Sequence, residues 1–121
     1  MTSSTALGKD ELCYKILVLT AKVDGYFHPR EAKVIEDFFS SKKMRVEKFA
    51  GLLNEIKNIP SSEFETHLQE AAKEYVECSK IEERENLILY TLKLINADEK
   101  VFPKESLAFT LVYNILNTNK N

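Results

Sequence analysis

The chain has 121 residues, with 17 Lys and Arg against 19 Asp and Glu, so its formal net charge is −2. It is 44% hydrophobic and 30% charged, which predicts one soluble globular domain and excludes an intrinsically disordered chain. The near-neutral charge and the scattering of cations among anions predict no nucleic-acid partner. No stretch approaches the ~18 apolar residues of a membrane span, so we expect no integral membrane segment and leave peripheral association open.

Apolar residues recur at helical spacing through most of the chain, and the sequence has no alternating strand pattern. We predict a flexible N-terminus over residues 1–8 and a single all-helical domain over residues 9–118. Helices are expected over residues 9–23, 29–41, 46–57, 62–78, 79–97 and 103–116. The predicted fold class is all-α, a compact bundle of six to seven short helices built from paired helical hairpins.

The fourth and fifth predicted helices each begin at a Ser-x-x-Glu pattern. Ser62 with Glu65, and Ser79 with Glu82, match the capping box that satisfies the first backbone N–H groups of a helix. The fifth helix is nearly apolar over residues 87–95, which predicts that it lies at the centre of the bundle. The charged run over residues 82–85 is expected to face solvent.

One short phrase occurs twice, once near each end of the chain, and each copy joins two predicted helices. The coinciding positions are an acid, an apolar residue, Pro, a cation and Glu: Asp24, Phe27, Pro29, Arg30 and Glu31 in the first copy, and Asp98, Val101, Pro103, Lys104 and Glu105 in the second. Pro suits the first position of a helix and Glu the third. Each copy is therefore predicted to form a helix–loop–helix corner with a carboxylate at either end of its loop.

These corners have two interpretations. If they meet in the fold, Asp24, Glu31, Asp98 and Glu105 come together, and their oxygens would suit a hard divalent cation, Ca²⁺ fitting best. The loops lack the EF-hand pattern, and the shortage of nearby His and Cys disfavours zinc. Alternatively, every shared residue has a structural role, because Asp ends one helix while Pro and Glu begin the next. The sequence leaves both interpretations open.

The other reactive side chains predict no catalytic or cofactor-binding residues. Cys13 and Cys78 form no C-x-x-C pair and are expected to be reduced, mostly buried thiols of a cytoplasmic protein. His67 is expected to be a partly exposed surface residue. We find no nucleophile elbow and no glycine-rich phosphate loop in the sequence.

The repeated phrase, placed near both ends of a helical domain of this length, resembles the TerB tellurite-resistance family and its relatives. These relatives include the N-terminal domain of membrane-anchored DnaJ-like co-chaperones. The resemblance covers roughly residues 12–116. It implies a compact domain of about seven helices in paired hairpins, without enzymatic activity, that serves in stress and metal resistance. Matched by motif, the acidic positions associated with a cation in the family fall on Asp24, Glu31, Asp98 and Glu105.

Three functions follow as hypotheses. The leading one is a non-enzymatic TerB-like stress module that binds partner proteins and a divalent cation through its paired acidic corners. The second is a plain protein-interaction or co-chaperone domain without an ion site. The third is a small enzyme that uses the acidic cluster for metal-assisted hydrolysis, which is disfavoured because no catalytic base accompanies the carboxylates.

Overall fold

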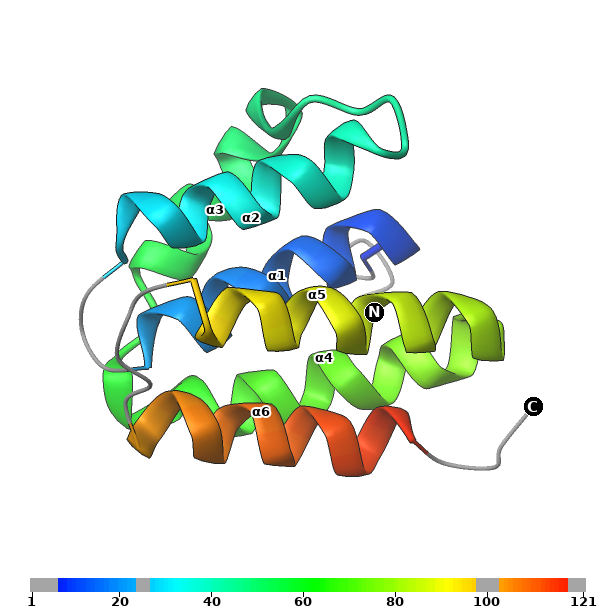
Figure 1. Ribbon diagram of the computed structural model, residues 1–121. Coiled ribbons are helices and arrows are strands. Elements are labelled where there is room, and N and C mark those ends of the chain that lie inside the picture. The colour runs from blue at the N-terminus through cyan, green and yellow to red at the C-terminus, as the bar shows by residue number, and fades with distance from the viewer. Residues whose placement is uncertain (1–6, 24–26, 98–102, 118–121) are drawn as a thin grey trace.

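The computed structural model describes residues 7–23, 27–97 and 103–117, and within these ranges the protein is helical and has no strand (Figure 1). The α-helices are α1 (Lys9–Lys22), α2 (Pro29–Ser40), α3 (Ala50–Lys57), α4 (Phe64–Cys78), α5 (Ile81–Ile95) and α6 (Pro103–Leu116). Two short 3-10 helices, Val46–Phe49 and Ser61–Glu63, precede α3 and α4. The predicted all-α bundle is confirmed.

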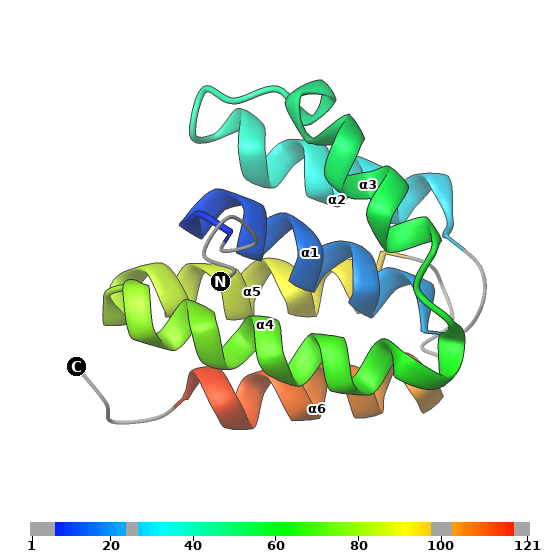
Figure 2. The ribbon, with the colours of Figure 1, turned by 180° about the vertical axis from the view of Figure 1, so that it is seen from behind.

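The helices stack in three tiers, with α2 and α3 in one outer tier, α1 and α5 in the middle, and α4 and α6 in the other outer tier (Figures 1 and 2). The end of α1 and the start of α2 lie at the same end of the bundle as the end of α5 and the start of α6. Each repeated phrase therefore joins two helix ends that lie at this same end of the molecule. None of the described helices is both long and apolar enough to cross a bilayer.

Helix α1 is the buried centre of the bundle, and the prediction that α5 holds this place is wrong. Nine of the 14 residues of α1 are buried, against five of the 15 residues of α5. Two leucines of the apolar run in α5, Leu89 and Leu92, are 48% and 41% exposed. Helix α1 packs against all five other α-helices, whereas one side of α5 forms part of an outer face. An apolar run within one helix therefore does not show which helix the others cover.

A cluster of aromatic rings fastens α2 and the 3-10 helix Val46–Phe49 to the middle tier. The Tyr14 ring of α1 stacks on Phe49 with centroids 4.8 Å apart, and Phe39 approaches Phe49 equally closely. Phe38 meets Tyr90 of α5 edge-on at 5.1 Å. Edge and offset contacts of this kind add to the stability that burial of the rings supplies.

Helices α1, α2 and α6 agree with the predicted bounds to within one residue, but the starts of α3, α4 and α5 differ. Residues 46–49 form a 3-10 turn before α3. Helix α4 begins after the 3-10 helix Ser61–Glu63, and its N-cap is Glu63 rather than Ser62. The Ser62–Glu65 capping box is therefore wrong, because the chain tightens into a 3-10 turn at that point.

The N-cap of α5 lies one residue after Ser79, the cap that the Ser79–Glu82 pattern predicts. Ser79 Oγ donates to the Tyr75 carbonyl at the end of α4 instead. The N-cap is Lys80, whose N–H donates to Glu83 Oε1 at 2.8 Å. Glu83 also accepts from Lys9 Nζ at 2.9 Å, and these two donors hold the pKa of its carboxyl below the ordinary value. Glu83 and not Glu82 therefore caps α5, and its salt bridge also links the start of α5 to α1.

The burial of Arg84 is a second difference between prediction and structure at the start of α5. The predicted solvent-facing run contains this arginine, yet its side chain is only 2% exposed. Its Nε donates to the Lys80 carbonyl at 3.5 Å, while Nη1 and Nη2 have no hydrogen-bond partner within the described part of the chain. Burial of a guanidinium in this way is costly.

The first helix starts at the residue that the apolar spacing predicts. Helix α1 begins at Lys9, with Gly8 as its N-cap. The Gly8 N–H donates to Glu11 Oε1 at 2.9 Å. Apart from residues 7 and 8, the predicted flexible segment 1–8 lies outside the described residues.

Candidate functional site

The corner that begins α2 confirms the predicted helix start in atomic detail. His28 is the N-cap, Pro29 the first helical residue and Glu31 the third. The His28 N–H donates to Glu31 Oε1 at 2.8 Å, and His28 Nδ1 accepts from the Arg30 N–H at 3.1 Å. Glu31 is only 3% exposed, so its carboxylate makes this hydrogen bond on the buried side of the helix start. Both side chains thus satisfy backbone groups that a helix start leaves open.

The corner that begins α6 repeats this placement. Pro103 is the first residue of α6, and Glu105 follows two positions later, as Glu31 follows Pro29. Glu105 is 1% exposed. A carboxylate rarely enters a protein interior unless a partner compensates its charge. The two copies of the phrase therefore place equivalent buried acids at the starts of α2 and α6.

Two of the four carboxylates predicted to bind a cation are among the residues that the structure describes. Glu31 and Glu105 are described, whereas Asp24 and Asp98 lie outside the described residues. Over the ranges that the structure covers, no three His, Cys, Asp or Glu side chains form a group able to hold a metal ion. Two buried acids suit a cation, but Oε1 of Glu31 already accepts a backbone hydrogen bond. The set of four stays a prediction.

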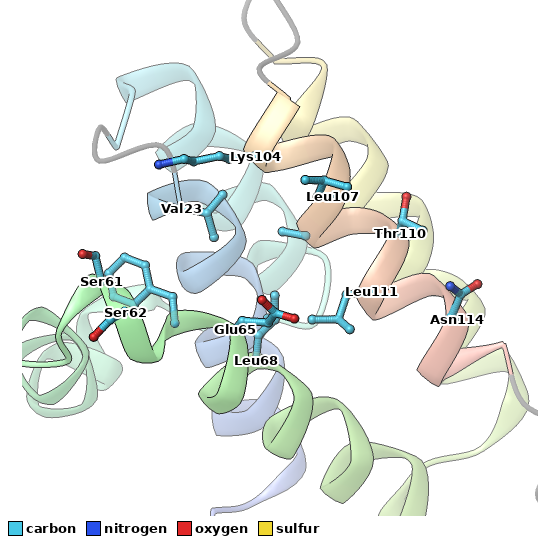
Figure 3. Close-up of a pocket in the computed structure, with 12 residues that line it drawn as sticks. Val23, Ser61, Ser62, Glu65, Leu68, Lys104, Leu107, Thr110, Leu111 and Asn114 are labelled. Atoms are coloured by element: carbon cyan, nitrogen blue, oxygen red, sulfur yellow. The ribbon is translucent and has the colours of Figure 1, made fainter.

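A groove of about 680 Å³ opens between α4 and α6 beside these corners (Figure 3). Its lining combines an apolar floor with a polar rim. The apolar residues are Val23, Phe64, Leu68, Leu107, Ala108 and Leu111, and the polar ones are Ser61, Ser62, Glu65, Lys104, Thr110 and Asn114. A concave surface of this size with a few polar groups has the form of a binding site.

Residues of both repeated phrases contribute to this groove. The first copy of the phrase begins with Val23, next to Asp24 and directly after α1, and in the second copy Lys104 stands between Pro103 and Glu105. Glu65 lies on the α4 wall and Lys104 on the α6 wall, so the two walls carry opposite charges (Figure 3). Sequence reasoning missed the groove, because it depends on how α4 and α6 pack. The helical spacing of Lys104, Leu107, Leu111 and Asn114 was the signal that could have suggested it.

The two thiols differ, and the expectation that both are buried holds only for Cys13. Cys13 is fully buried in α1, and burial raises the pKa of its thiol to about 12. Cys78 is exposed, and desolvation raises the pKa of its thiol more modestly. Both are free. His67 is partly exposed, as predicted, and lies 3.6 Å from a carboxylate oxygen of Glu63.

The family model described as "Tellurite resistance protein TerB" matches residues 12–121, nearly the whole chain. No curated protein and no solved structure matches the chain.

Proposed function

Because the chain belongs to the TerB family, we propose that it is a non-enzymatic module of a stress or metal-resistance system that binds a partner protein in the groove between α4 and α6. One observation carries this proposal: residues of both copies of the repeated phrase, Val23 and Lys104, line the same apolar groove. The phrase by which the family is recognised thus lies beside the surface that we assign to partner binding.

The exposure of the groove supports this assignment. Leu107 of its α6 wall is 71% exposed, the largest value among the exposed large hydrophobic side chains of the described chain. Apolar surface that stays open in a folded domain, rimmed by polar groups, commonly marks an interaction site. The rim here includes Ser61 and Asn114, which can donate and accept hydrogen bonds.

The surroundings of Cys13 and His28 support a non-enzymatic role. A thiol attacks as the thiolate, and Cys13, with a pKa of about 12, stays protonated at neutral pH. His28 Nδ1 accepts a backbone hydrogen bond at a helix start, where it serves as a cap. The free thiols also agree with the cytoplasmic location that we propose.

A divalent cation at Asp24, Glu31, Asp98 and Glu105 is the second part of the proposal. It is supported by the equivalent burial of Glu31 and Glu105 at one end of the bundle. The bound cation would neutralise these carboxylates and hold the two corners together. One observation favours the alternative, an interaction or co-chaperone domain without an ion: Glu31 already caps α2.

Calcium titration separates these two functions. If the cation site exists, Ca²⁺ at a hundredfold excess over its dissociation constant should stabilise the fold by about 2.7 kcal/mol. The change is measured as a rise in melting temperature. Asp24→Asn with Asp98→Asn should remove that rise and leave the ion-free protein folded. An unchanged melting temperature in millimolar Ca²⁺, Mg²⁺ or Mn²⁺ would favour the domain without an ion.

Photo-crosslinking in cells tests the groove. A photoreactive amino acid replaces Leu107 on the α6 wall, and a matched variant carries it at Lys33 of α2, whose side chain is 70% exposed. We expect a defined protein adduct from position 107 and none from position 33. Equal labelling from both positions, or none from either, would contradict partner binding at the groove.

A further inference from the structure

The α6 wall of the groove carries a stripe of side chains with a symmetric spacing. Lys104, Leu107, Leu111 and Asn114 all line the groove and lie on one face of α6 (Figure 3). Successive members are three, four and three residues apart, so the spacing is the same from either end. This is the spacing with which one helix packs along another.

The symmetry makes the stripe complementary to a second copy of itself. In an antiparallel pair of α6 helices related by a two-fold axis, Leu107 faces Leu111 of the other copy, and Lys104 faces Asn114. Leucine then meets leucine, and the ammonium group can donate to an amide oxygen. A parallel pair would instead set Lys104 against Lys104, and like charges disfavour that arrangement.

We propose that the groove between α4 and α6 receives α6 of a second copy of this chain, so that the protein forms an isologous antiparallel dimer. This inference rests on the proposed function of the groove and names its occupant. The exposed Leu107 of each copy would enter the groove of the other, beside Phe64 and Leu68 of α4. Each copy contributes the same surface, as a closed two-fold dimer requires.

The two terminal segments that lie outside the described residues match the groove less well in sequence. Residues 1–6 read Met-Thr-Ser-Ser-Thr-Ala, and residues 118–121 read Thr-Asn-Lys-Asn. Apart from Met1 they carry no large apolar side chain that could cover a floor of leucine, valine and phenylalanine. The α6 stripe of a second copy supplies two leucines at the required spacing.

The size of the contact places it among weak or transient interfaces. One helix of 14 residues spans about 20 Å, and a standard interface buries about 800 Å² on each partner. An interface centred on α6 lies at or below that size, so we expect a dissociation constant on the order of tens of micromolar.

Sedimentation velocity from about 5 to about 500 µM, a range that spans such weak association, tests the dimer. The mass should rise from 13.9 kDa toward twice that value. Leu107→Ser should keep the protein monomeric throughout. Leu89→Ser is the matched control, since Leu89 is also an exposed leucine but lies on α5 outside the groove. Circular dichroism checks that both variants are folded.

Disulfide trapping tests the register. In a Cys78→Ser background, Lys104→Cys chains are mixed with Asn114→Cys chains under mild oxidation. The antiparallel register sets these positions opposite each other, so the mixed disulfide should dominate. Identical positions of the two copies are offset by about 15 Å along the helices, so either variant alone should cross-link poorly.

A monomer at the highest concentration, a dimer that Leu107→Ser leaves intact, or equal cross-linking of the single variants would overturn the dimer. If position 107 still cross-links to a different protein in cells, the groove binds another partner, and only the inference about a second copy fails. If the chain is monomeric and position 107 yields no adduct, the proposed function fails as well.

Discussion

The helix pair α1–α2 and the helix pair α5–α6 begin their second helices with the same Pro-x-Glu arrangement, yet the bundle covers them to different extents. Glu31 and Glu105 occupy equivalent, buried positions. Helix α1, however, is enclosed by its neighbours, whereas α5 and α6 form an outer face. All five exposed large hydrophobic side chains of the described chain belong to this second pair: Ile81, Leu89, Leu92, Leu107 and Tyr113.

This difference separates two roles that one sequence phrase can serve. In the first pair α1 is enclosed by the other helices, and Glu31 caps the start of α2, so this helix start contributes to stability. In the second pair the same kind of corner opens a helix that keeps apolar side chains at the surface and forms a wall of the groove. A local motif can thus specify a helix start without specifying whether the helix is buried or available for binding.

The largest expected effect comes from shortening leucines in the two pairs. Leu17 of α1 is fully buried, whereas Leu89 of α5 is 48% exposed. Leu17→Ala should lower the free energy of unfolding by about 2–5 kcal/mol, because it leaves a cavity in the centre of the bundle. Leu89→Ala should change it by about 0.5 kcal/mol. Urea denaturation measures both, and equal costs would mean that α5 is as well covered as α1.

A smaller effect tests whether the two corners are equivalent. Glu31→Ala removes the acceptor of the His28 N–H and should cost about 1–2 kcal/mol of stability. Glu105→Ala should cost a similar amount if the buried acid at the start of α6 has the same role. Glu36→Ala, at an exposed position of α2, is the control and should change stability by about 0.5 kcal/mol or less. A cost at Glu31 but not at Glu105 would show that the corners differ.

The smallest expected change is a gain in stability at Arg84 of α5. Its Nη atoms are buried and find no hydrogen-bond partner among the residues that the structure describes. Arg84→Met keeps much of the side-chain volume and removes the buried charge, so it should raise the free energy of unfolding by about 1 kcal/mol. Arg84→Ala should instead destabilise, because it leaves a cavity. A loss of stability in Arg84→Met, measured by urea denaturation, would show that the guanidinium is compensated in the folded protein.

Features that depend only on residues close together in the chain could be predicted from the sequence. The bounds of α1, α2 and α6 follow from apolar spacing. Pro29 and Glu31 predict the start of α2, because helix capping involves groups within one turn. One local signal was nevertheless misread, at the start of α5. Glu83 rather than Glu82 caps α5, and Lys9, which lies 74 residues earlier in the chain, holds its carboxylate.

The sequence by itself therefore determined the helical class, most helix bounds and the equivalence of the Pro-x-Glu helix starts. Only the tertiary structure decided that α1 and not α5 is central, that Cys78 is exposed and Arg84 buried, and that α4 and α6 leave a groove between them. The physical reason is that helix periodicity identifies an apolar face but not the element that covers it. Coverage depends on how six helices share one core, and that arrangement is set by contacts between residues far apart in the chain.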